Sequence, residues 1–301
     1  MFNKIVIIEK INMLEEDIER LKQLGKEFIY YKDLPSDDNE ILKRIDDADC
    51  VLLSYTSKID KYVIDNAPNI KYIGMCCSLY SKESANVDIE EAENKGIVVK
   101  GIRDYGDEGV CEYIIHELTE FLGGYHNKLV WSDYPEEISS LKCAVIGLGT
   151  SGTLIARTLK FFGADVSYYS RTRKEDSEKM YGITYKPLKR ALEEADAIFL
   201  ALNKNVLLLQ DEEFNVMNGK KILFNTSIGP GFSIEAFKKW IDKPNHYFFG
   251  DTLNTIGDIS LWDKENCFTI NRSSGGTTHE AYRRLGQKVI NNIVSYFEEI
   301  R

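Results

Sequence analysis

The sequence has few prolines, few histidines and no excess of positive charge. Six prolines and four histidines occur among 301 residues, and Asp and Glu outnumber Lys and Arg by 48 to 38. The resulting net charge of −10 argues against the basic surface that a nucleic-acid-binding protein would show. No run approaches the roughly 18 apolar residues of a membrane span, and the N-terminus lacks the order of a signal peptide. We therefore expect an acidic cytoplasmic protein that binds neither nucleic acid nor membranes.

The cysteines form no CxxC pair and no cluster with histidine that has the spacing of metal ligands. Most of them lie inside apolar runs, where a cysteine is usually a small buried hydrophobic residue. We expect reduced core thiols, as is usual in the cytoplasm, and no metal site. The six are Cys50, Cys76, Cys77, Cys111, Cys143 and Cys267.

Short apolar runs alternate with polar helical stretches along most of the chain. We expect strands at 5–8, 28–31, 51–53, 72–74 and 97–99, and again at 143–147, 165–170, 197–202, 221–225, 247–250 and 267–270. A long helix over 106–123 and a loop over 128–141 separate the two sets, and a helix over 278–299 ends the chain. Apolar runs without polar alternation are typical of strands covered on both faces. The order predicts an α/β protein with two doubly wound parallel-sheet domains.

A glycine-rich turn, Gly147-Leu148-Gly149-Thr150-Ser151-Gly152, follows one of these strands and opens a helix. Gly147 permits a tight turn, Gly149 lets a pyrophosphate approach the backbone, and Gly152 lets the helix pack closely on the strand. The N-terminus of the helix offers unpaired N–H groups to phosphate. Thr150 and Ser151 stand at this N-terminus, and we predict both as cofactor contacts. The alternative is an ordinary glycine-rich turn, but strand, turn and helix together favour dinucleotide binding.

The next strand ends in Ser170-Arg171-Thr172-Arg173-Lys174, without the carboxylate that would bind the adenosine ribose of NAD. Arginine can hold a 2′-phosphate with two hydrogen bonds, and lysine adds charge. A solvated loop is the alternative. Because the cations stand at the strand tip, we predict Ser170, Arg171, Thr172 and Arg173 as cofactor contacts and favour NADP over NAD.

Further segments resemble one known family. They are Asn86–Ala92 with Lys95–Ile97, Val110–Glu112, Asn225-Thr226 with Gly229, and Thr278–Ala281. With the glycine turn, they resemble the D-isomer-specific 2-hydroxyacid dehydrogenase family, the group of phosphoglycerate dehydrogenase and the glyoxylate/hydroxypyruvate reductases. The resemblance implies a Rossmann nucleotide domain, residues 104–277, inserted in a flavodoxin-like substrate domain, residues 1–103 plus 278–301. It also implies that Asn225, Thr226 and Ser227 lie at the cofactor.

The family uses an Arg to bind the substrate carboxylate, a His to protonate the developing alkoxide, and a Glu to support the His. Hydride addition builds negative charge on oxygen, so a positioned acid is physically required. In this sequence the Arg position holds Ile228 and the Glu position holds Ile256. The His position holds Ser273 or Asn271, depending on the alignment. The family mechanism with a 2-oxo acid therefore lacks its three groups.

Six residues are candidates for the missing roles. His279 lies near the cleft by family analogy, and Arg272 could supply a displaced cation beside Ser273. His116 lies on the long apolar helix, and the segment 76–83, which takes the place of the family's substrate loop, carries Tyr80 and Lys82. For each candidate, the alternative is a packed or solvent-exposed residue without a catalytic role. The candidates are His279, Arg272, Ser273, Tyr80, Lys82 and His116.

The sequence favours an NAD(P)-dependent oxidoreductase, specifically an NADPH-dependent reductase with a non-standard substrate and proton donor. An imine, an activated alkene or a carbonyl compound without the usual carboxylate would not need the missing Arg. One alternative is a catalytically inactive NADP-binding regulatory module, and another is conventional activity restored by other groups. The expected partner is a small-molecule substrate. The resemblance to the family also makes a homodimer possible.

Overall fold

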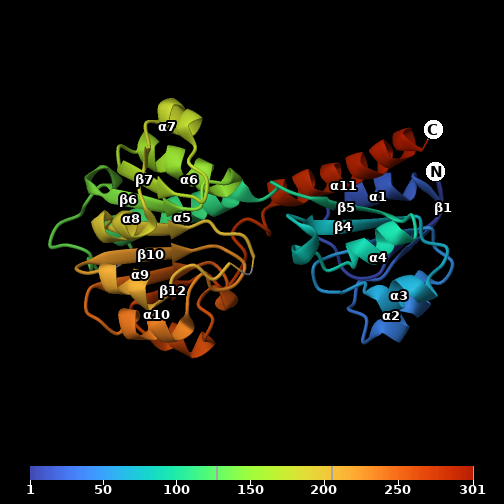
Figure 1. Ribbon diagram of the computed structural model, residues 1–301, viewed down its shortest axis with the longest axis horizontal. Helices are drawn as coiled ribbons and strands as arrows, with labels where there is room; N and C mark the ends of the chain where they lie inside the picture. The colour runs from blue at the N-terminus through green and yellow to red at the C-terminus, as the bar shows by residue number, and fades with distance from the viewer. Residues whose placement is uncertain (127, 205, 301) are drawn as a thin grey trace. The chain divides into compact units, whose positions relative to one another are not determined.

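The computed structural model describes residues 1–126, 128–204 and 206–300, and it divides into two compact units. Unit 1 comprises Met1–Tyr105 and Gly276–Arg301, and unit 2 comprises Gly106–Gly275. The boundaries predicted from the sequence, after residue 103 and before residue 278, differ from these by two residues at each crossing. Unit 2 is thus an insertion between the first hundred residues and the last helix (Figure 1).

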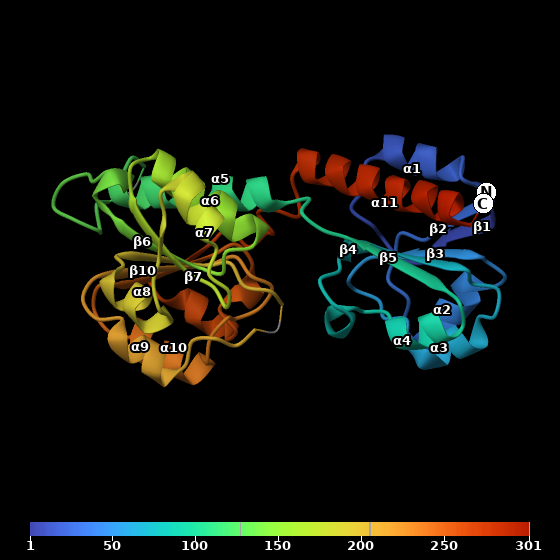
Figure 2. The same cartoon turned by 45° about the horizontal axis from the view of Figure 1, so that its top comes forward.

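Unit 1 is a five-stranded parallel sheet covered by helices on both faces. The strand order is β2-β1-β3-β4-β5. The last helix, α11, lies beside α1 on one face, and α2, α3 and α4 cover the other (Figure 2). The elements are β1 (Phe2–Ile7), α1 (Glu15–Lys22), β2 (Gly25–Tyr30), α2 (Asp38–Ile45), β3 (Cys50–Leu53), α3 (Lys61–Asn66), β4 (Tyr72–Ser78), α4 (Ile89–Asn94), β5 (Val98–Ile102) and α11 (His279–Glu299).

Unit 2 is a seven-stranded parallel sheet with the order β12-β11-β10-β9-β6-β7-β8. Helices α5 and α6 pack on one face, and α8, α9 and α10 pack on the other. The elements are α5 (Asp107–Gly123), β6 (Lys142–Ile146), α6 (Thr150–Phe161), β7 (Asp165–Tyr169), α7 (Glu175–Tyr181), β8 (Thr184–Tyr185), α8 (Leu188–Glu194), β9 (Ala197–Leu200), α9 (Asp211–Val216), β10 (Lys221–Asn225), α10 (Ile234–Ile241), β11 (His246–Gly250) and β12 (Cys267–Thr269).

The strands are buried on both faces, which explains why they read as continuous apolar runs. In unit 2, alternate residues of β10 point to opposite faces, so that Phe224 packs under α5 while Leu223 packs under the helices of the other face. The predicted fold class, two parallel-sheet α/β domains, is confirmed. All six cysteines are buried free thiols, also as predicted.

The two segments that join the units touch each other through glycines. A Cβ atom added to Gly106 would lie 2.4 Å from the carbonyl oxygen of Gly275, and one added to Gly275 would lie 2.3 Å from the carbonyl oxygen of Gly106. No side chain fits at that distance. The entry and exit of unit 2 therefore lie backbone against backbone.

Among the described residues, no helix is both long and apolar enough to cross a bilayer.

Candidate functional site

The sheet of unit 2 has its topological switch point at β6, whose neighbours are β7 on one side and β9 on the other. Chain connections leave in opposite directions from this point, and open α/β sheets usually bind ligands at the carboxyl ends of the strands beside such a point. The predicted glycine turn follows β6 directly, and the Ser170–Arg173 segment follows β7. The fold therefore brings these two predicted groups to the same edge of one sheet.

Each glycine of the turn has a separate geometric role. Gly147 has a φ of +100°, and a Cβ atom there would lie 2.4 Å from the carbonyl oxygen of Ala201. A Cβ atom on Gly152 would lie 1.9 Å from the carbonyl oxygen of Gly147, so this glycine sets the spacing of α6 against the turn. An added Cβ atom on Gly149 meets nothing within 4 Å. The space beside Gly149 is the place where a pyrophosphate could approach the backbone, so the turn fits a dinucleotide.

The first turn of α6 contains Thr150, which is exposed, and Ser151, which is half-buried. The hydroxyl group of Ser151 donates a hydrogen bond to the carboxylate of Asp107, the first residue of α5. The Ser151 side chain is thus engaged within the protein, while the backbone N–H groups at the start of α6 are available to an anion. Sequence reasoning missed Asp107, because nothing local links two residues 44 positions apart.

The loop after β7 presents one arginine to solvent and ties up the other. Arg173 donates from Nε and Nη2 to the two carboxylate oxygens of Glu178, at 2.8 and 2.9 Å. This arginine lowers the pKa of Glu178 to about 2. Arg171 is exposed and, within the described parts of the chain, has no hydrogen-bond or ion-pair partner. The Ser170 hydroxyl donates to the carbonyl oxygen of Thr172 at 2.6 Å, which shapes the loop.

The predicted cofactor contacts after β10 are largely occupied by internal hydrogen bonds. The Asn225 side-chain amide donates to the carbonyl oxygens of Gly229 (3.1 Å) and Thr255 (2.8 Å), and its oxygen accepts from the backbone N–H of Ser227 (3.0 Å). The Ser227 hydroxyl accepts from the N–H of Leu202 at 3.0 Å. Asn225 and Ser227 therefore position this loop through their side chains. Thr226 lies between them and is half-buried.

The residues that the sequence analysis assigned to the family's three catalytic positions are Ile228, Ile256 and either Asn271 or Ser273, and the structure places each of them in a different environment. Ile228 is 63% exposed, and Ile256 is fully buried in the core. Asn271 is exposed and has a φ of +51°. Ser273 is half-buried, and Arg272 beside it is exposed and donates its backbone N–H to the carbonyl oxygen of Asp251 at 2.8 Å.

Asp251, at the end of β11, is a buried carboxylate close to these positions. It accepts hydrogen bonds from the backbone N–H (2.9 Å) and the hydroxyl (2.7 Å) of Ser274. Burial raises the pKa of Asp251 above its ordinary value, and the hydrogen bonds from Ser274 oppose that shift. Sequence reasoning did not propose Asp251 as a site residue. The structure adds it as a titratable group at the carboxyl edge of the sheet.

Unit 1 holds three other candidates. Tyr80 is exposed on the loop after β4, and Arg103 donates to the carbonyl oxygens of Leu79 (2.5 Å) and Tyr80 (2.7 Å) from the end of β5. Lys82 forms an ion pair with Glu93 at 2.5 Å, which raises the pKa of the lysine and keeps it charged. His279 is exposed at the start of α11, with its Nδ1 atom 3.7 Å from a carboxylate oxygen of Glu280.

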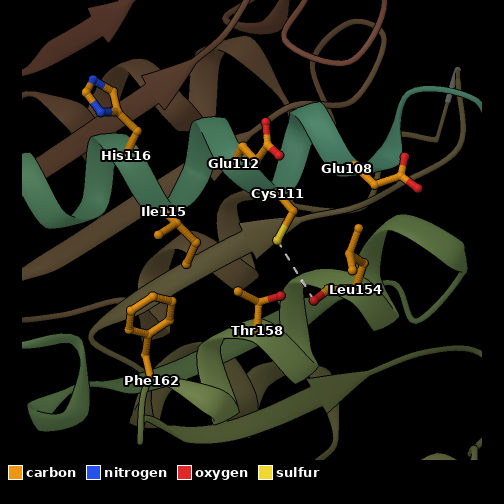
Figure 3. A pocket seen from close by; sticks show the side chains of 8 residues that line it. All are labelled: Glu108, Cys111, Glu112, Ile115, His116, Leu154, Thr158 and Phe162. Atoms are coloured by element: carbon orange, nitrogen blue, oxygen red, sulfur yellow. Dashed lines mark hydrogen bonds between the residues drawn. The ribbon is translucent and has the colours of Figure 1, made fainter. Parts of the chain in front are cut away.

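His116 lies along a groove between α5 and α6 rather than at the carboxyl edge of the sheet. The groove has a volume of about 460 Å³, and Cys111, Ile115 and Thr158 point into the space between the helices (Figure 3). His116 is exposed at the rim, with its ring turned away from α6. The sequence placed His116 on an apolar helix, and the structure shows that it occupies the exposed side of that helix.

Comparison with known proteins agrees with this architecture. The family model described as D-isomer specific 2-hydroxyacid dehydrogenase, catalytic domain, matches residues 5–301. The glyoxylate reductase of Pyrococcus furiosus is 25% identical over 311 residues, which cover 95% of this chain and 88% of that protein.

Two solved structures share the fold. An acyclic imino acid reductase in complex with NADPH and D-Arg is 20% identical, with a TM-score of 0.82 and coverage of 98% of this chain and 97% of that one. The D-lactate dehydrogenase of Aquifex aeolicus, complexed with NAD and lactic acid, is 19% identical, with a TM-score of 0.77 and coverage of 99% and 96%. The chain therefore belongs to the D-isomer specific 2-hydroxyacid dehydrogenase family, and it is an oxidoreductase.

Proposed function

We propose that this protein is an NADPH-dependent reductase whose substrate is not held by the carboxylate clamp of its family, with an imine as the substrate class. Family membership supports a nicotinamide cofactor. The open space beside Gly149 supports a dinucleotide, and the exposed Arg171 at the tip of β7 supports its 2′-phosphorylated form. When bound, the reduced nicotinamide cofactor supplies a hydride.

The observation that carries the substrate class is the side chain at position 228. Ile228 is 63% exposed where the family has an arginine, and an aliphatic side chain offers neither charge nor a hydrogen-bond donor to a carboxylate. A protonated imine carries its own positive charge at the reacting centre. Hydride addition to its carbon gives a neutral amine, so no acid has to neutralise a developing alkoxide. The solved imino acid reductase complex with NADPH shows that the same fold accommodates such chemistry in another protein.

The other groups have supporting roles in this proposal. Asp251, held by Ser274, places a buried carboxyl group near the position that the family gives to its histidine. Its raised pKa reflects an environment that disfavours full ionisation, so it suits a hydrogen-bonding or proton-exchanging role better than a plain carboxylate would. Tyr80 is a substrate contact, held in place by Arg103.

The substrate class is tested by following NADPH consumption with glyoxylate or hydroxypyruvate, alone and with an added primary amine. We expect turnover only when the amine is present, because it forms the imine in solution. Reduction of the free oxo acids at equal rates would contradict the proposal. Cofactor binding without any turnover in either series would instead support the inactive regulatory module.

The cofactor is tested separately by titration with NADPH and NADH. We expect Arg171→Ala to weaken NADPH binding about tenfold, the value of a charge-assisted phosphate contact, and to leave NADH binding unchanged. Arg173→Ala is the matched control, because Glu178 already engages that guanidinium, and its effect should be smaller. Equal losses for both cofactors in Arg171→Ala would refute the assignment to NADP.

A further inference from the structure

A polar cleft lies in unit 1 between α1 and α11, away from the residues discussed so far. The two helices run side by side (Figure 2), and Gly286 allows them to approach so closely that a Cβ atom there would lie 2.2 Å from Oδ2 of Asp17. The cleft beside this contact has a volume of about 330 Å³, at the lower end for small-molecule sites. Its lining contains no apolar side chain and consists of Glu16, Asp17, Arg20, Arg283, Arg284, Gln287 and Lys288.

In one buried carboxylate of the cleft, only one of the two oxygens accepts a hydrogen bond from the described residues. Asp17 is 3% exposed, and its Oδ1 atom accepts a hydrogen bond from Nη1 of Arg20 at 2.9 Å. The same Arg20 atom also donates to the Gln287 side chain at 3.1 Å. The Oδ2 atom of Asp17 is buried and has no hydrogen-bond partner among the described residues. Arg20 is therefore paired with Asp17. This pair does not account for the positive charges of the other three cationic side chains in the cleft.

Three cations of α11 stand close together on the other wall. Arg284 donates from Nε to the carbonyl oxygen of Tyr105 at 2.8 Å. Arg283 and Lys288 have no hydrogen-bond or ion-pair partner in the portion of the chain that the structure describes. Arg284 and Lys288 are four residues apart, a spacing at which like charges repel each other on a helix. Four cationic and two carboxylate side chains line the cleft, which leaves an excess of two positive charges in a chain whose net charge is −10.

We propose that this cleft binds a small, doubly charged oxyanion, either a phosphomonoester or a dicarboxylate. The guanidinium of Arg283 can hold two oxygens at once, and the ammonium of Lys288 adds a point charge from the next turn of the same helix. Such an anion would cancel the excess charge and relieve the repulsion along α11. The volume suits a small metabolite and is too small for a dinucleotide. The site is formed by unit 1 alone and is independent of the dinucleotide turn in unit 2.

The test is thermal denaturation of the full chain with increasing inorganic phosphate, malonate or acetate at constant ionic strength. It is run in the Gly149→Val background as well as in the parent, because phosphate could also occupy the dinucleotide turn. We expect a saturable rise of the melting temperature with phosphate, with malonate, or with both. If only one of the two anions acts, it identifies the ligand as a phosphomonoester or a dicarboxylate; if both act, the site selects for a double negative charge.

The double variant Arg283→Gln/Lys288→Gln should weaken the apparent affinity about tenfold or more, since two charged contacts are removed. Both side chains are at least partly exposed, and neither contributes to the core. The matched control is Lys43→Gln, which removes an exposed charge from α2 on the opposite face of the same sheet and should leave the affinity unchanged. The proposal is overturned if the double variant keeps the parent affinity, if Lys43→Gln loses as much, or if acetate acts as strongly as phosphate.

Discussion

Two glycines of the same turn should respond to substitution in opposite ways. An added side chain at Gly149 meets open space, and the residue has a φ of −83°, which any amino acid adopts. At Gly152 a Cβ atom would lie 1.9 Å from a backbone carbonyl oxygen, which cannot move without distorting the turn. Gly149→Val should therefore block the cofactor and preserve the fold, whereas Gly152→Ala should damage the fold itself.

The magnitudes follow from these contacts. Gly149→Val exchanges glycine for valine at the N-cap of α6, which costs about 1 kcal/mol of folding free energy, or roughly 2 to 4 °C in melting temperature. The valine side chain fills the space for the pyrophosphate, and losing its charged hydrogen bonds should weaken dinucleotide binding about a hundredfold. Gly152→Ala forces one methyl group into a filled space, at a cost of about 3 kcal/mol, or roughly 6 to 12 °C.

Fluorescence titration with the reduced cofactor and thermal denaturation measure the two effects on the same samples. The contrast between the two variants is the control, since a general loss of stability would lower both quantities together. Normal dinucleotide affinity in a folded Gly149→Val variant would show that the cofactor does not approach this turn. A melting temperature for Gly152→Ala equal to that of the parent would show that Gly152 does not lie against the carbonyl group of Gly147.

Two other substitutions test the electrostatics of unit 2. Glu178→Gln removes the carboxylate that engages Arg173 and so leaves that guanidinium available to the cofactor phosphate. NADPH affinity, measured by calorimetric titration, should rise about threefold, with no change for NADH. A decrease in NADPH affinity would contradict this. Asp251→Asn tests the raised pKa of Asp251. Because the folded protein holds that proton more tightly than the unfolded chain does, the stability contributed by this group is present below the ordinary pKa of 3.8 and is lost as the pH rises through the folded value. The variant should therefore melt above the parent near neutral pH, and the difference should shrink as the pH falls; a constant difference in melting scans across pH would contradict this.

The sequence was sufficient for most of the elements and for the position of the glycine-rich turn, because both depend on local patterns. Apolar runs identified β6 and β9 as buried strands, and the spacing of glycines predicted a turn that the structure places at the switch point. The two-residue strand β8 was missed, since it is too short to carry a periodic signal. The predicted domain boundaries differ from the division into units by two residues at each crossing.

Two polar contacts of the candidate site were harder to predict for a physical reason. The hydrogen bonds of Asp107 and Asp251 join residues far apart along the chain, which one-dimensional spacing does not record. Arg173 looked equivalent to Arg171 in the sequence, and only the structure shows that Glu178 engages one of them. The same holds for His116, whose helix is apolar on one side and exposed on the side that carries the imidazole.

The glycine pair at the junction also bears on how such a protein can be re-engineered. Since Gly106 and Gly275 are in backbone contact, the two ends of the nucleotide-binding segment emerge side by side, as the ends of a transplantable cassette must. Residues 106–275 could be grafted into a tight surface turn of an unrelated host without long spacers. Conversely, residue 105 and residue 276 could be joined by a short linker to connect the two segments of unit 1 without residues 106–275.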